Sequence, residues 1–207
     1  MSNNGIGENQ QEFHCGRFIL SFSKPLVMGI LNLTPDSFSD GGRFEKVGDV
    51  MKSAELMVKN GADILDIGAE STRPGSNEIN SETEWQRLKE ILPLLYEMNI
   101  PISLDSKKPD IMRRALSSGI DMINDVSGFR SPDSLKVVEE SFEKNIGFCI
   151  MHMQGIPENM QDCPRYVDVV AEVEHFLMDR FHYFTKIGVK KNNILIDPGL
   201  GFGKNSS

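Results

Sequence analysis

Short apolar runs alternate with longer segments of helical character along most of this chain, and this alternation constrains the fold more than any other feature. Turn-forming residues bound the runs, which read LVMGI, ILDIG, ISL, MIN, GFCIM and ILI. Because each run is too short for a helix, we predict strands there, with helices at residues 45–60, 82–98, 109–118, 134–144 and 167–187. Strands that alternate with helices predict parallel βαβ units.

Polar residues follow the carboxyl ends of the predicted strands, whereas the opposite ends are comparatively bland. These residues are Asn32, Glu70, Ser71, Thr72, Arg73, Asp105, Asn124, His152 and Asp197. Functional residues gathered at the carboxyl ends of many strands are typical of a TIM barrel, whereas a doubly wound sheet concentrates them at one switch point. We therefore predict an α/β fold of the (β/α)8 TIM-barrel type.

About six βα units of such a barrel are present in the sequence. An eight-unit barrel takes roughly 250 residues, and this chain has 207. We expect the two C-terminal units to be missing, which leaves open edges on the first and last strands. We expect the chain to be a piece of a longer enzyme; the alternative is that another chain supplies the missing part. We predict one truncated barrel domain at residues 25–207, preceded by a lead-in at residues 1–24 with a candidate β-hairpin around RFILSFS.

Charge and hydropathy exclude two classes of partner. The formal net charge is −8 and no run of Lys and Arg exceeds two residues, so nucleic acid is not expected. No apolar stretch approaches the roughly 18 residues of a membrane span, and the N-terminus MSNNGIGENQ lacks the features of a signal peptide. We expect a cytoplasmic protein with a small-molecule substrate, whose Cys15, Cys149 and Cys163 are reduced thiols.

Six motifs together resemble the dihydropteroate synthase family, in its order and at its spacing. They are MGILNLTPDSFSDGG, DIGAESTRPGS, SLDSKKPDIM, MINDVSG, CIMHMQG and LIDPGLGFGK. The resemblance implies a folate-pathway transferase that joins 6-hydroxymethyl-7,8-dihydropterin diphosphate to p-aminobenzoate, giving 7,8-dihydropteroate and diphosphate. It also implies Mg²⁺ as cofactor, sulfonamides as inhibitors, and a homodimer whose dimerising helices lie in the part that we expect to be missing.

The resemblance places Asn32 at the site of the metal and the diphosphate. Its amide oxygen suits Mg²⁺, which prefers oxygen ligands and often takes only one or two from protein. The resemblance further implies that the loop at residues 34–42, which contains Phe38, closes over the substrates.

The second loop, ESTRPGS, carries a permanent cation beside a hydroxyl and a proline. Arg73 offers a planar fork of donors that suits a carboxylate or a diphosphate. The resemblance places Thr72, Arg73 and Pro74 beside p-aminobenzoate, with Arg73 also at the diphosphate. We expect Glu70 and Asp66 to be structural partners of this region.

Asp105, Asn124 and Asp197 each end a predicted strand, so their side chains should converge over the barrel mouth. A pterin presents an edge of adjacent donors and acceptors, which a carboxylate or an amide can match with paired hydrogen bonds. The three residues match the family's pterin pocket, with Met151 as an apolar floor, and we predict Asn32, Arg73 and Asp105 to be catalytic. The alternative, to which Asp105 is most open, is that they cap the following helices.

Two other functions remain open from the sequence. One is a methyltetrahydrofolate-dependent methyltransferase of the same barrel class, although the TPDSFSDGG and ESTRPG loops favour the synthase. The other is a non-catalytic pterin-binding fragment, because the family carries a Ser-Arg-Lys motif and an Arg-x-His motif beyond the last residue of this chain. His152 is expected to be structural, as a lone histidine usually is.

Overall fold

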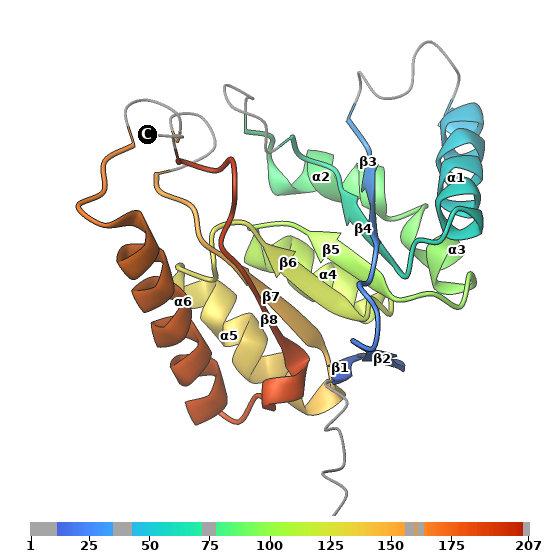
Figure 1. Cartoon of the computed structure of the whole chain (residues 1–207). Helices are drawn as coiled ribbons and strands as arrows, with labels where there is room; N and C mark the ends of the chain where they lie inside the picture. The colour runs from blue at the N-terminus through green and yellow to red at the C-terminus, as the bar shows by residue number, and fades with distance from the viewer. Residues whose placement is uncertain (1–11, 35–42, 72–77, 156–159, 161–163, 205–207) are drawn as a thin grey trace, which may run out of the picture.

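The protein is built on one sheet of six parallel strands in strict chain order (Figure 1). The computed structural model describes residues 12–34, 43–71, 78–155, 160 and 164–204. The strands are β3 (Met28–Asn32), β4 (Ile64–Gly68), β5 (Ile102–Asp105), β6 (Met122–Asp125), β7 (Gly147–Met151) and β8 (Ile194–Asp197). All six predicted strands are therefore confirmed, and each pairs in parallel with its neighbour in sequence.

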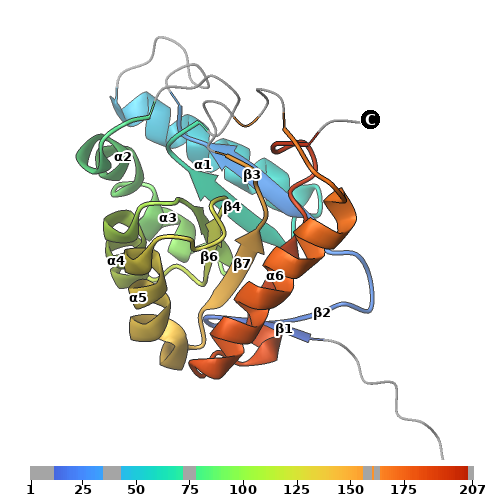
Figure 2. The same ribbon diagram turned by 90° about the vertical axis from the view of Figure 1, so that its left-hand side faces the viewer.

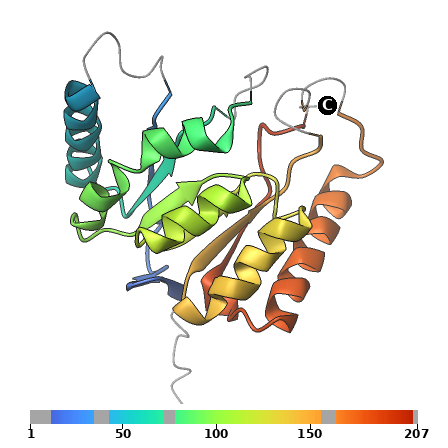
Figure 3. The ribbon, with the colours of Figure 1, turned by 180° about the vertical axis from the view of Figure 1, so that it is seen from behind.

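The helices of the described residues lie along one side of this curved sheet, as seen from behind in Figure 3. They are α1 (Arg43–Lys59), α2 (Ser81–Leu88), α3 (Leu92–Tyr96), α4 (Pro109–Ser117), α5 (Pro132–Ser141) and α6 (Val169–Lys186), with short 3-10 turns η2 (Phe142–Lys144) and η3 (Lys191–Asn193). Side chains of Asn80, Ser131 and Asp168 accept hydrogen bonds from the first-turn amides of α2, α5 and α6. Polar caps thus fix where these helices begin.

The single helix predicted at residues 82–98 is wrong, because the chain forms two helices there. α2 ends at Leu88 and α3 begins at Leu92, with Pro93 in its first turn. Proline has no amide hydrogen and clashes with the carbonyl one turn before it, so it fits the start of a helix and interrupts its middle.

An antiparallel hairpin closes the amino end of the sheet (Figure 2). It consists of β1 (Glu12–Cys15) and β2 (Phe18–Ser21), at the place where the sequence indicated a hairpin. Phe13 and Cys15 form a buried cluster with Met122 and Cys149. At Gly147, the first residue of β7, an added Cβ would lie 2.6 Å from Phe13 Cζ, so glycine makes room for the hairpin.

The two outermost strands each pair on one side only within the part of the chain that the structure describes. β3 pairs with β4 and β8 pairs with β7. Ile30 on β3 is 50% exposed and Ile196 on β8 is 51% exposed, whereas every residue of β4 and β7 is buried. Apolar side chains on both edge strands of the sheet are therefore exposed to solvent.

Candidate active site

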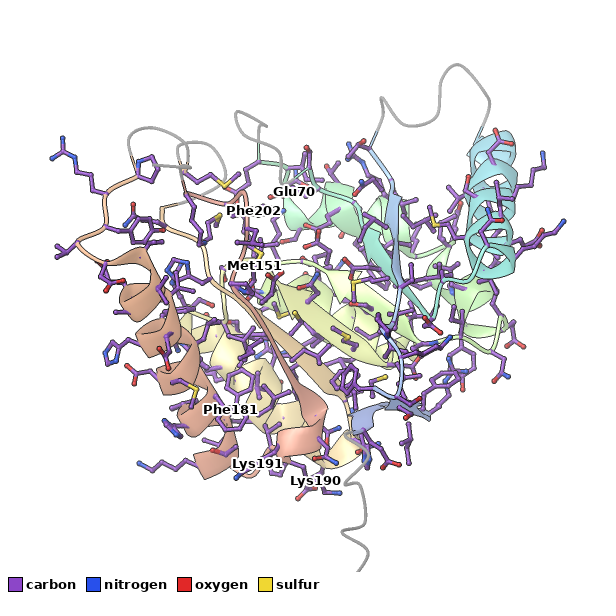
Figure 4. All side chains as sticks on the ribbon, in the orientation of Figure 1. Glu70, Met151, Phe181, Lys190, Lys191 and Phe202 are labelled. Carbon is purple, nitrogen blue, oxygen red and sulfur yellow. The ribbon has the colours of Figure 1, made fainter. Side chains whose placement is uncertain are left out.

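The predicted site residues that the structure describes lie at the carboxyl ends of the strands. Asn32 ends β3, Asp105 ends β5, Met151 ends β7 and Asp197 ends β8, while Asn124 is the third residue of β6. Figure 4 shows Met151 at this end of the sheet, on the same side of the molecule as Glu70 and Phe202. Four predicted residues, Phe38, Thr72, Arg73 and Pro74, lie outside the described residues, as does most of the loop at 34–42.

Asp66, Asp105 and Asn124 form a polar group inside this end of the sheet. Asn124 Nδ2 donates a hydrogen bond of 3.1 Å to Asp66 Oδ2. One side-chain oxygen of each of the three residues is buried and has no hydrogen-bond partner. Since buried polar atoms in folded proteins are normally paired, these three oxygens are suited to receive hydrogen bonds from a ligand.

Burial and neighbouring carboxylates hold the pKa of Asp105 well above its ordinary value. Desolvation is the largest cause, followed by the negative charges of Asp66, Asp125, Glu84 and Glu70. Desolvation also raises the pKa of Asp66. Such a group favours a ligand that brings several N–H donors, because each donor compensates a poorly solvated carboxylate.

The alternative role of Asp105 as a helix cap is not what the structure shows. The residue at the N-cap of α4 is Lys108, which makes no side-chain cap. Asp197 does stabilise the turn that follows it, since its Oδ1 accepts a hydrogen bond of 2.7 Å from the amide of Gly199. Asp125, which sequence reasoning missed as a buried acid, accepts bonds from the amides of Ser127 and Phe129 and so organises the loop after β6.

Met151 lies in a small apolar cluster beside the polar group. It is 3% exposed and packs with Val126, Met153 and Met160, with Phe202 partly buried against them. At Gly199, where φ is +66°, an added Cβ would lie 2.0 Å from the carbonyl oxygen of His152. Only glycine therefore permits the turn after β8 to pass this close to the end of β7.

His152 is a buried structural residue in this geometry. Its Nδ1 lies 3.1 Å from Lys204 Nζ, and that amine also donates to the carbonyls of His152, Gly199 and Phe202. Desolvation, followed by the charges of Lys204 and Arg130, lowers the pKa of His152 to about 4. The imidazole is thus neutral at physiological pH and ties the ends of β7 and β8 together.

A buried ion-pair network beside the polar group was missed by sequence reasoning. Lys108 Nζ lies 2.7 Å from Glu84 Oε2 and also contacts Glu70. Ser106 Oγ donates a hydrogen bond of 2.6 Å to Glu84 Oε1. Glu70 is indeed a structural partner of its loop, as expected, whereas Asp66 bonds to Asn124 in the polar group instead.

The described residues offer little to hold a metal without help from a ligand. They contain no group of three His, Cys, Asp or Glu side chains that is arranged around a metal position. Asn32 is exposed at the end of β3, beside Gly68 of β4. No helix within the described segments is both long and apolar enough to cross a membrane.

Comparison with known proteins gives a consistent result. The sequence profile of the family described as "Pterin binding enzyme" matches residues 28–207. The chain is 43% identical to the dihydropteroate synthase of Neisseria meningitidis serogroup C over 194 residues, which are 93% of this chain and 68% of that relative.

Two solved structures extend the similarity to three dimensions. The dihydropteroate synthase of Burkholderia cenocepacia in complex with 7,8-dihydropteroate gives a TM-score of 0.82 at 44% identity and covers 94% of this chain and 65% of that one. The Xanthomonas albilineans enzyme with 4-aminobenzoic acid gives 0.84 at 41% identity and covers 95% and 69%. These structures confirm the predicted partial (β/α)8 barrel, and the chain spans about two thirds of the length of these proteins.

Proposed function

Because this chain belongs to the pterin-binding enzymes and, within them, to the dihydropteroate synthases, we propose that it supplies most of the pterin pocket of such an enzyme. The reaction joins 6-hydroxymethyl-7,8-dihydropterin diphosphate to p-aminobenzoate and yields 7,8-dihydropteroate and diphosphate. The observation that carries the proposal is the set of three buried, unpartnered oxygens on Asp66, Asp105 and Asn124. The bound product in the Burkholderia cenocepacia structure supports it.

The residues of this chain act mainly by binding and orienting. Asp105 and Asp66 accept hydrogen bonds from the N–H groups of the pterin, while Asn124 uses its amide nitrogen for Asp66 and so turns its oxygen to the ligand. Met151 and its apolar neighbours lie against the ring. Electron release from the dihydropterin ring then assists departure of diphosphate, and the aniline nitrogen of p-aminobenzoate attacks the methylene carbon. Little proton chemistry is needed, so positioned charge supplies most of the acceleration.

Mg²⁺ is part of the proposal, with Asn32 as its protein ligand. An exposed amide oxygen at a strand end fits a site in which substrate phosphates and water provide the other ligands, which is the usual manner of Mg²⁺ binding. When bound, the metal would neutralise charge on the departing diphosphate. Arg73 is proposed to do the same and to hold the carboxylate of p-aminobenzoate, with Thr72, Pro74 and Phe38 beside it.

Sulfonamides, which resemble p-aminobenzoate, are proposed inhibitors, and the cytoplasm is the proposed location. Cys15 and Cys149 are free and buried, which agrees with a reducing compartment. The homodimer that the resemblance implies stays a prediction.

The test compares two proteins. One is the 207-residue chain, and the other is this chain extended by the C-terminal third of the Neisseria meningitidis relative. We expect the chain alone to bind 7,8-dihydropteroate in a calorimetric titration, and the chimera to form dihydropteroate from both substrates with Mg²⁺. If the chain binds the pterin but the folded chimera forms no product, the non-catalytic pterin-binding fragment becomes the better account. Absence of both binding and product would contradict the proposal.

A further inference from the structure

The turn that follows β8 (residues 198–204) is folded around one amine, that of Lys204. Lys204 Nζ donates hydrogen bonds of 3.0–3.1 Å to three carbonyl oxygens, those of His152, Gly199 and Phe202, and lies 3.1 Å from His152 Nδ1. An ammonium group has three N–H donors and no acceptor, so four acceptors of the chain itself share them. The amine therefore holds protein backbone in place rather than meeting a ligand.

The bonds of Lys204 connect this turn to the end of β7. Two further bonds lie within the turn and its own strand: the Gly199 amide donates to Asp197 Oδ1 at 2.7 Å, and the Phe202 amide donates to the Gly199 carbonyl at 3.0 Å. These two bonds shape the turn but do not reach β7. Lys204 does reach it, because His152 directly follows that strand. The lysine therefore sets where Phe202 lies relative to β7.

Phe202 is the accessible member of the apolar cluster that is proposed to receive the pterin. Val126, Met151, Met153 and Met160 are 1–4% exposed, whereas Phe202 is only partly buried against them. Figure 4 shows Phe202 and Met151 at the same end of the sheet. A flat ring that enters the site from solvent therefore meets the side chain of Phe202, and the placement of that side chain decides how well the ring packs.

We propose that Lys204 is a positioning residue for the pterin. Its ammonium group fixes the backbone of Phe202 to the residue after β7, and so holds the aromatic ring of Phe202 where the pterin packs. Lys204 itself does not touch the pterin. This inference rests on the proposed function, in which the apolar cluster around Met151 lies against the pterin ring.

The test measures the affinity of the 207-residue chain for 7,8-dihydropteroate by calorimetry. In Lys204→Met we expect the affinity to fall at least tenfold, because the turn that carries Phe202 is no longer fixed to β7. Lys191→Met makes the same chemical change at an exposed position at the opposite end of the sheet (Figure 4). We expect it to change the affinity less than twofold.

A double-mutant cycle shows whether Lys204 acts through Phe202. In a Phe202→Ala background there is no ring to position, so adding Lys204→Met should lower the affinity less than twofold further. A general loss of stability would instead lower the affinity by the same factor in both backgrounds. Tyr166→Phe is the second control, because it removes a different bond to the same turn, the 2.7 Å bond from Tyr166 Oη to the carbonyl of Gly203. We expect its affinity to stay within twofold of the wild type.

The pKa of His152, measured by NMR titration, supplies a readout that needs no ligand. The positive charge of Lys204 is one cause of the low value of about 4, so the pKa should rise in Lys204→Met. Burial and the charge of Arg130 remain, and the pKa should therefore stay below 6.5. If Lys204→Met fails to fold, Lys204→Arg keeps the charge but replaces the compact amine by a planar fork that cannot serve the same acceptors. It should lower the affinity at least tenfold and leave the pKa of His152 low.

Three results overturn the inference while leaving the proposed function intact. They are wild-type affinity in a folded Lys204 variant, a tenfold loss that persists in the Phe202→Ala background, and an equal loss in Tyr166→Phe. If the wild-type chain does not bind 7,8-dihydropteroate although the pKa of His152 responds to Lys204→Met, the proposed function has failed. The role of Lys204 toward the pterin then fails with it.

Discussion

At the scale of single residues, the site buries carboxyl groups in surroundings that disfavour their ionised form. Asp105 is the clearest case, because its pKa is raised by burial and by four neighbouring carboxylates. The folded chain thus retains a proton on Asp105 at pH values where the unfolded chain has released it. The stability contributed by protonated Asp105 is therefore lost as pH rises from about 3.8 through the folded-state pKa.

Asp105→Asn should consequently separate stability from binding. We expect the ligand-free variant to unfold at a higher urea concentration than the wild type at pH 7, with the gain shrinking as pH falls toward 3.8. Its affinity for 7,8-dihydropteroate should fall by about 10- to 100-fold, since a charge-assisted hydrogen bond contributes roughly 1.5–3 kcal/mol. Asp49→Asn, an exposed change on α1, is the control. Unchanged pterin affinity in Asp105→Asn would remove Asp105 from the proposed pocket.

His152 gives a second prediction, in which the free energy of unfolding changes with pH in the opposite direction. Its folded-state pKa of about 4 lies below the ordinary 6.5, so the unfolded chain binds more protons in this interval and stability falls as pH drops from 6.5 to 4. His152→Gln, which keeps an acceptor for Lys204 but does not titrate, should lose up to about 3 kcal/mol of this pH dependence. Urea unfolding at several pH values measures it. His175→Gln, on the exposed face of α6, should retain the wild-type slope; an identical slope in His152→Gln would exclude the histidine as its source.

At the scale of elements, Arg17 is one of the residues that attach the hairpin to the rest of the chain. Arg17 donates to both carboxylate oxygens of Asp121, which is 1% exposed, and to the carbonyl of Tyr96, while its guanidinium lies 3.8 Å from the centre of the Tyr96 ring. These contacts attach the hairpin to segments that lie far away in sequence.

Arg17→Ala should therefore reduce the free energy of unfolding by about 2–3 kcal/mol, because it removes charge-assisted bonds to a buried carboxylate. The control is Arg113→Ala, which breaks an exposed pair with Glu140 and should lower stability by at most about 1 kcal/mol. Urea titrations compare the two. Equal losses would show that the hairpin is held by its apolar cluster rather than by Arg17.

The elements were predicted from the sequence far better than the contacts between them. Buried strands such as GFCIM are continuous apolar runs, and polar residues at their carboxyl ends mark the active-site end of a barrel. Pro93, in the first turn of α3, is the sequence signal for the break between α2 and α3 that the single helix predicted at residues 82–98 does not take into account. The network of Glu84, Lys108 and Glu70 left no local signal, since its members come from three segments and Glu84 looks in sequence like an ordinary acid in the first turn of a helix.

At the scale of the whole molecule, the outermost strands β3 and β8 each leave one edge of the sheet unpaired within the residues that the structure describes. An unpaired strand edge with exposed apolar side chains is a template for association with another chain. We expect the 207-residue chain to self-associate as its concentration rises, and Ile30→Lys together with Ile196→Lys to shift sedimentation profiles toward the monomer. Val170→Lys, an equally drastic change at an exposed position of α6, should not. Monomeric behaviour of the wild type at high concentration would show that these edges are inert.

The position of the hairpin at the amino end of the sheet affects when it can dock during synthesis of the chain. After β3, each strand of the six-stranded sheet pairs with the strand synthesised just before it, so units can be added in order as the polypeptide leaves the ribosome. The docking of the hairpin does not follow this order. Arg17 can bind Asp121, and the amide of Gly16 can bond to the carbonyl of Asn145, only after those partners have been synthesised. Its apolar residues, Phe13 and Cys15, are among the first of the described chain to emerge. They reach their final position only after more than a hundred further residues have been translated.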